Sequence, residues 1–235
     1  MWLRRDEAAR EFAAWEIISV TLSLLLLIWV VLPLSGNSKS VGAAFIAVCF
    51  AFMLASHRLH GETRREIGWR CDNFLAAMGW VVLLICFFAI PLTIGAWLLV
   101  SGSDASISET GKLFGDGEID LSNGAQLFWQ LAMIFSGLAQ QYLMQGFINR
   151  RAQIVFGRGP VSVLVVGLIF TLLHLPNKWL MLAAFVEGLG WAFIFQRVPN
   201  LFALAVSHAV MTRLIIILIP DHFLQGLRIG YRFFN

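Results

Sequence analysis

The sequence predicts an all-α protein, a polytopic transmembrane helical bundle of about seven spans that forms a single integral membrane domain over residues 1–235. Of its residues, 59% are apolar and only 13% are charged, about half the charged share of ordinary soluble domains. The apolar residues form long continuous runs that lack the alternating pattern of barrel strands. Because hydrocarbon offers the backbone no water, continuous apolar runs favour helices that satisfy their own hydrogen bonds.

Seven apolar runs predict the helices in chain order. They cover residues 17–34, 41–55, 74–100, 127–148, 160–175, 179–195 and 201–219. Most approach the ~20 residues that a spanning helix needs, and the shorter ones leave little room for tilt. The segment 58–72 and the tail 222–235 mix basic with apolar residues, so each is expected to lie at the membrane surface or to be an ordinary juxtamembrane segment.

The arginines predict the orientation in the membrane. Most of them, from Arg4 to Arg197, precede the first apolar run or follow the second, fourth and sixth, which places all of these positions on one side. The loop 101–126, on the other side, is acidic. By the positive-inside rule we expect an integral, multi-pass protein of a bacterial inner (plasma) membrane with a cytoplasmic N-terminus. The net charge of +3 reflects this topology, and no nucleic-acid partner is predicted.

Polar residues inside the apolar runs are the candidate site residues, because a central charge costs about 2.5–3.5 kcal/mol on insertion scales. Gln141 and Gln145 are four residues apart and are expected to share a helix face. The two histidines, on separate runs, are expected to meet the glutamines at one cavity. The full set is Gln140, Gln141, Gln145, His174, Glu187, His208, Thr212 and Arg213.

Three segments carry a family resemblance. Residues 140–146 read Gln-Gln-Tyr-Leu-Met-Gln-Gly, residues 170–174 read Phe-Thr-Leu-Leu-His, and residues 208–212 read His-Ala-Val-Met-Thr. In order and spacing they resemble the Glu-Glu-x-x-x-Arg-Gly, Phe-x-x-x-His and His-x-x-x-Asn segments of the CAAX-protease and bacteriocin-processing (CPBP, or Abi) family of intramembrane glutamic proteases. The resemblance covers about residues 127–215 and implies a CPBP-like helical core.

The resemblance also implies roles for these positions. In the family, the first Glu is understood to activate a water held with the two His, while the Asn and a His stabilise the oxyanion. Here Gln140 takes the place of that Glu, and an amide cannot accept a proton near neutral pH. The loss of a positioned general base typically lowers the rate by ~10²–10⁴. Gln141, Gln145 and Thr212 replace the second carboxylate, the Arg and the Asn.

These four departures predict a proteolytically inactive pseudoprotease. Its expected surroundings are the lipid bilayer and other membrane proteins, and its cavity is expected to bind a transmembrane helix, a lipid-like hydrophobic ligand or a partner subunit of a larger membrane complex. The first alternative is an active CAAX-type intramembrane endopeptidase with an altered site. A transporter or channel is the last alternative, since no inverted repeat or pair of broken helices is visible.

Glu187 keeps the first alternative open. Burial in a bundle disfavours its charged form, so it is expected to be a neutral hydrogen-bonding group. It could instead pair with Arg213 or a His, or serve as a relocated base. No cofactor is predicted; zinc held by His174, His208 and Glu187 is the alternative, because two His and a carboxylate are a common zinc set.

Overall fold

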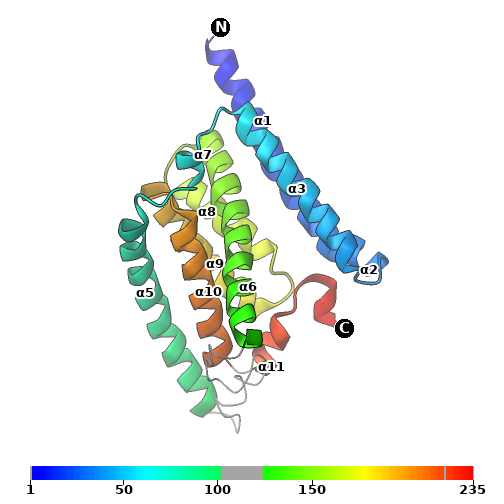
Figure 1. Cartoon of the computed structure of the whole chain (residues 1–235), viewed down its shortest axis with the longest axis vertical. Helices are drawn as coiled ribbons and strands as arrows, with labels where there is room; N and C mark the ends of the chain where they lie inside the picture. Colours follow the sequence, from blue (N-terminus) through cyan, green and yellow to red (C-terminus); the bar gives the residue numbers. More distant parts are fainter. Residues whose placement is uncertain (1, 102–123, 220, 235) are drawn as a thin grey trace.

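A computed structural model of the chain describes residues 2–101, 124–219 and 221–234. Within these ranges the regular secondary structure is entirely helical, which confirms the all-α prediction (Figure 1). Most of the predicted acidic loop 101–126 lies outside the described residues.

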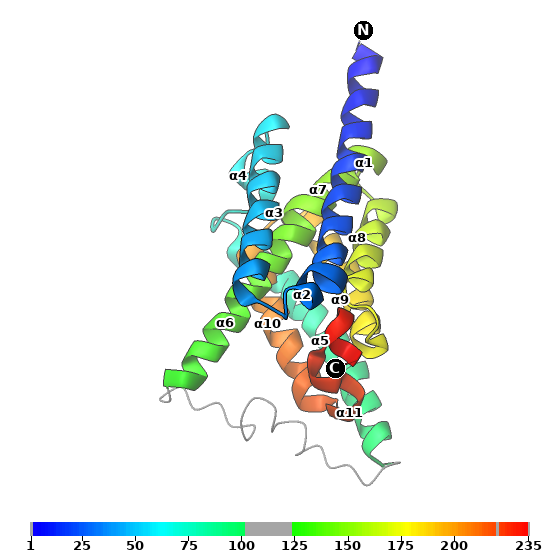
Figure 2. The same ribbon diagram turned by 90° about the vertical axis from the view of Figure 1, so that its right-hand side faces the viewer.

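The first helices form a hairpin that we call the N-terminal arm. Helix α1 (Trp2–Leu26) continues through a π-helical turn, η1 (Leu27–Val31), into α2 (Leu32–Leu34), and α3 (Lys39–Leu59) runs back. Gly36 and Asn37 make the tight turn with positive φ angles of 63° and 59°. The arm lies along one edge of the other helices, and its two helices diverge away from the turn (Figures 1 and 2).

A short helix and a long one follow the arm. Helix α4 (Arg64–Ile67) begins with a capping box in which Thr63 and Glu66 bond each other's backbone N–H groups. It ends at Gly68, where φ is 91° and an added Cβ would lie 2.7 Å from the Phe195 ring. Helix α5 (Phe74–Ser101) then runs along the outside of the bundle beside α10.

The fourth predicted run becomes part of one continuous helix with an unusual middle. Helix α6 (Gly124–Gln141) leads into the π-helical segment η3 (Tyr142–Asn149) and then into α7 (Arg150–Phe156). π-Helical winding bonds each residue to the fifth along the chain and is frequent at functional sites.

The remaining helices complete the core. Helix α8 (Pro160–Leu172) packs against α9 (Lys178–Arg197), and α10 (Leu201–Leu218) packs against both α5 and α6. Asn177 and Asn200 cap α9 and α10 by accepting backbone N–H bonds. The tail consists of α11 (Asp221–Leu224), η4 (Gln225–Leu227) and η5 (Gly230–Phe234). The core lies between η3, α8, α9 and α10 and includes the buried Phe147, Trp191, Phe195, Leu204 and Met211.

Five of the described helices are long and apolar enough to cross a membrane. They are Glu7–Leu34, Lys39–Leu59, Phe74–Gly95, Lys178–Arg197 and Leu201–Leu218. The two other predicted spans are also helical: one corresponds to α6 with η3, and the other to α8, which has only 13 residues. The bundle therefore has a helix at each of the seven predicted runs, and five of these meet the length and composition of a full span.

Candidate functional site

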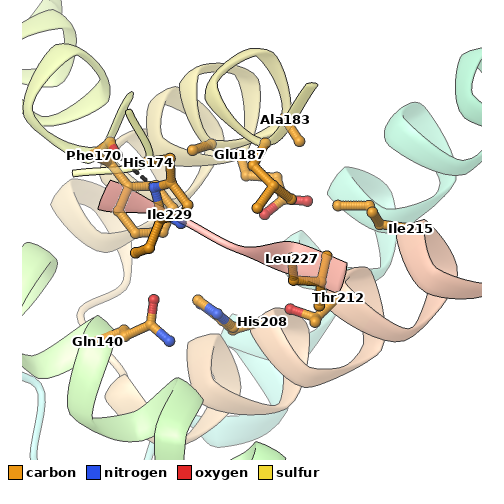
Figure 3. A pocket seen from close by; sticks show the side chains of 12 residues that line it. Gln140, Phe170, His174, Ala183, Glu187, His208, Thr212, Ile215, Leu227 and Ile229 are labelled. Atoms are coloured by element: carbon orange, nitrogen blue, oxygen red, sulfur yellow. Dashed lines mark hydrogen bonds between the residues drawn. The ribbon is translucent and has the colours of Figure 1, made fainter. Parts of the chain in front are cut away.

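A cavity of about 300 Å³ lies among α6, α8, α9, α10 and the tail (Figure 3). Its polar lining residues come from four separate parts of the chain: Gln140, His174, Glu187, His208 and Thr212. The rest of the wall is largely apolar and includes Phe170, Leu180, Ala183, Ala184 and Ile215. Five of the eight predicted site residues thus border one cavity.

His208 is held on both sides. Its ring stacks on that of Trp191, with the centroids 4.9 Å apart and the planes at 13°, and Trp191 is itself fixed because its indole N–H donates to Ser207 Oγ at 3.0 Å. Gln141 Nε2 lies 3.3 Å from His208 Nδ1, so the amide N–H donates to that nitrogen when the ring proton is on Nε2. Gly137 lets α6 approach, since an added Cβ would lie 3.2 Å from His208 Cβ.

His174 follows α8 directly and lies across Phe170 from His208. Its Nδ1–H donates to the Phe170 carbonyl oxygen at 2.7 Å, which leaves Nε2 to accept a hydrogen bond. The His174 and His208 rings both pack on the Phe170 ring, at centroid distances of 4.7 Å and 6.2 Å, so they lie within about 11 Å of each other. Both histidines are therefore placed to contact one small ligand.

Glu187 reaches the cavity from α9, on the same wall as Ala183 (Figure 3). Its side chain is buried, and its Oε1 has no hydrogen-bond partner within the part of the chain that the structure describes. Arg213 does not line the cavity, and no ion pair joins it to Glu187 among the described residues. Neither the predicted pairing with Arg213 nor a hydrogen bond for that oxygen is seen.

The three glutamines lie in three different environments. Gln140 lines the cavity and donates to Ser136 Oγ at 3.3 Å, whereas Gln141 lies behind the wall against His208. Gln145 is fully buried elsewhere and accepts from Asn149 Nδ2 at 2.9 Å. Gln141 and Gln145 are both buried, but they bond different partners, His208 and Asn149, so the two amides do not act at one site.

Gln145 begins a buried network of neutral groups that the sequence analysis did not predict. Asn149 Nδ2 also donates to the Ala192 carbonyl, and Asn149 Oδ1 accepts from Gln196 at 3.1 Å. Gln196 in turn donates to Ser162 Oγ at 2.8 Å. Gln145 stands where the CPBP motif has an Arg. Through Asn149, its amide joins η3 to α9 without burying a charge.

The tail forms part of the cavity wall. Leu227 and Ile229 form part of the lining and cross the view of Figure 3. Asn177 Nδ2 donates to the Leu224 carbonyl at 2.8 Å, and the Gly230 N–H donates to the Leu175 carbonyl at 2.6 Å. Because it is bonded to the loop between α8 and α9, the tail is a wall of the site.

A second group of polar residues, the buried charge cluster, joins the arm to α7. It consists of Glu16, Ser56, His57, His60, Glu62, Arg150 and Arg151. Burial alone would raise the pKa of Glu62, but the hydrogen bond with His57 and the charges of Arg151 and Arg150 lower it to about 2. The sequence analysis used only the arginines of this cluster, and only as topology markers; Glu16, one residue before the first apolar run, was the available signal.

The cavity suits binding of a polar group at the end of an apolar ligand. It offers two imidazoles, an amide, a hydroxyl and a carboxyl group within mainly apolar walls. Among the described residues, no three His, Cys, Asp or Glu side chains are arranged to hold a metal ion. The fold and the cavity together define a polytopic helical membrane protein with a buried polar site.

The comparison with protein families finds a match to the part of the chain that forms the cavity. The model of the family described as type II CAAX prenyl endopeptidase Rce1-like matches residues 123–213. This stretch holds every polar residue of the cavity, and the match confirms the resemblance that the three motifs predicted. Searches of curated proteins and of solved structures found no significant match.

Proposed function

We propose that this protein is a proteolytically inactive relative of the CAAX proteases that uses the old catalytic cavity to bind a hydrophobic ligand or a segment of a membrane partner. The observation that carries the proposal is Gln140 at the place of the general base, on the wall of the cavity that holds both histidines. An amide there can position a ligand by hydrogen bonds but cannot take a proton from water.

Apolar hollows beside the cavity support a hydrophobic occupant. One, of about 330 Å³, lies between α5 and α9 and shares Ala183 with the cavity. Another, of about 150 Å³, shares Gln140, Phe170 and His174 and reaches Ile28 of the arm. A ligand whose polar end lies between the histidines has apolar surface to follow in two directions.

The first experiment tests for hydrolysis. Purified full-length protein is incubated with a prenylated peptide and with a transmembrane peptide, and we expect no cleavage. Gln140→Glu alone should not create robust activity, because Gln141, Gln145 and Thr212 leave the site incomplete. His174→Ala and His208→Ala should change thermal stability or partner recovery rather than turnover. Cleavage by the unmodified protein that is lost in His174→Ala would refute the proposal.

The second experiment tests for an occupant. Mass spectrometry identifies molecules and proteins that copurify in mild detergent with the unmodified protein and with Ala183→Phe, which fills the junction between the cavity and the α5–α9 hollow. We expect this variant to lose the occupant. Val210→Phe is the matched control, since Val210 is partly exposed on α10 and lines none of the hollows described above. Equal recovery from all three proteins argues against binding at this site.

A working endopeptidase is the second candidate, and one observation favours it. Glu187 lines the same cavity as His174 and His208, which is the placement that a relocated base requires (Figure 3). Under this alternative, Glu187→Gln abolishes a measurable hydrolysis. We propose no bound metal for either candidate. Elemental analysis of the purified protein tests the alternative of zinc held by His174, His208 and Glu187.

The proposed setting is a bacterial inner membrane with the N-terminus in the cytoplasm. The arginine distribution supports it, with Arg64, Arg65 and Arg70 after α3, Arg150 and Arg151 after η3, and Arg197 at the end of α9. Partner subunits of a membrane complex remain part of the proposal.

A further inference from the structure

A second cavity, of about 630 Å³, lies between the end of α3, α4, η3 and the start of α10. It shares no lining residue with the candidate site. None of the motifs discussed above contributes to its wall except Tyr142, which follows Gln141.

Two buried polar atoms in its wall lack a partner among the described residues. They are His57 Nε2 and the Tyr142 hydroxyl, and the two side chains belong to residues only 3% and 2% exposed. The other ring nitrogen of His57 is held by Glu62 at 2.6 Å, so Nε2 is the atom left for a ligand. A buried polar atom is costly to leave unpaired, and both atoms belong to side chains that line the same cavity.

The charge around this cavity favours an anion. Arg58 and Arg64 line it, both are exposed, and neither forms an ion pair within the described ranges. The one acidic lining residue, Glu62, is already engaged by Arg150 and Arg151 at 2.9 Å and 2.8 Å. Two free guanidinium groups therefore remain, and a guanidinium fork matches the geometry of a phosphate.

Apolar surface continues from these charges. Leu54, one turn before Arg58 on α3, is 52% exposed, and Phe202 of α10 lines the same cavity. Trp69 packs against both Tyr142 and Phe202, with ring centroids 5.8 Å and 5.5 Å apart. Since Lys39–Leu59 is a candidate span, Arg58 lies at its end, where lipid headgroups meet the protein.

We propose that the second cavity binds an anionic phospholipid of the adjacent leaflet. Its phosphate lies between Arg58 and Arg64 and accepts a hydrogen bond from the Tyr142 hydroxyl, and an acyl chain follows Leu54 and Phe202. His57 Nε2 bonds a headgroup oxygen. The apolar wall favours a lipid over free phosphate, because free phosphate has no acyl chain to occupy it.

Native mass spectrometry of the full-length protein tests this, with phosphatidylglycerol or phosphatidylcholine as the probe in mixed micelles. We expect a retained phosphatidylglycerol adduct, and a loss of occupancy on the order of tenfold for Arg58→Gln or Arg64→Gln. The matched control is Arg65→Gln. Arg65 is the neighbour of Arg64 in α4, its side chain is 74% exposed, and it does not line the cavity.

Tyr142→Phe gives an independent arm. It removes a buried hydroxyl that has no partner among the described residues, so the lipid-free protein should fold at least as stably, while phosphatidylglycerol binding should weaken. Unchanged binding in the Arg58 and Arg64 variants, or an equal loss in Arg65→Gln, would overturn the proposal. Competition by inorganic phosphate as strong as that by phosphatidylglycerol would also overturn it, in favour of a free-phosphate site.

Discussion

Replacing Arg151 tests how the arm is held to the bundle. Arg151 is fully buried, with Nε 2.8 Å from Glu16 Oε2, Nη1 2.8 Å from Glu62 Oε2 and Nη2 donating to Ser56 Oγ at 2.6 Å. Its guanidinium also lies 4.8 Å from the Phe147 ring centroid. Arg151→Met keeps the apolar stem and leaves two carboxylates without their shared cation.

The expected loss of stability follows from those contacts. Breaking a buried pair by removing one partner costs about 3–5 kcal/mol. Here the value should lie near the lower end, because Glu62 keeps Arg150 at 2.9 Å and Glu16 keeps His60 at 2.9 Å. We therefore expect a loss of about 3 kcal/mol in the free energy of unfolding.

Denaturation in mixed micelles, followed by tryptophan fluorescence, measures this loss. The control Arg65→Met removes an exposed charge 3.9 Å from Asp72 and should cost less than about 1 kcal/mol. Adding Glu16→Gln to Arg151→Met should recover about 1 kcal/mol, because it removes one of the stranded charges. An Arg151→Met protein within about 1 kcal/mol of the unmodified one would refute the reasoning.

Three further predictions concern pH, the tail and topology. The pKa of Glu62 is lowered from 4.5 to about 2, so its contribution to stability is present above pH 4.5 and is lost as the pH falls toward 2; the unfolding midpoint should drop more steeply there than in Glu62→Gln. Gly230→Ala should release the tail, since a Cβ would collide with Ile28 Cγ2 where φ is 60°; faster proteolysis of the tail measures this. Gly226→Ala is the control, because its φ is similar, 64°, but a Cβ there would make only ordinary contacts with the Arg228 side chain. An impermeant thiol reagent should label Ser106→Cys on intact cells, and labelling only after lysis would contradict the proposed orientation.

The helical class could be predicted from composition and run length, because a bilayer leaves few alternatives to the helix. The polar residues of the cavity could be named for a similar reason: His208 and Glu187 stand out in apolar runs whatever their packing. Their relative placement could not. It depends on helix crossings such as that of α8 and α9, where a Cβ on Gly188 would lie 3.2 Å from Gly167 Cα.

Gln145 and Glu16 show two other limits of sequence reasoning. Gln145 bonds Asn149 and does not line the cavity, and residue spacing alone does not say which partner a buried amide finds. Glu16 is charged and lies at the edge of an apolar run, where charges ordinarily contact water. Its burial depends on Arg151, which is remote in sequence and reaches it only through the packing of α7 against α1.

The hydrogen bond between the Gly230 N–H and the Leu175 carbonyl can indicate whether the cavity wall is closed. The preceding residue, Ile229, is part of the lining, so a ligand that displaces the Ile229 backbone should also lengthen or break this bond. Exchange of a single amide hydrogen with deuterium would then distinguish an occupied cavity that keeps its wall from one that has opened, without a label inside the membrane.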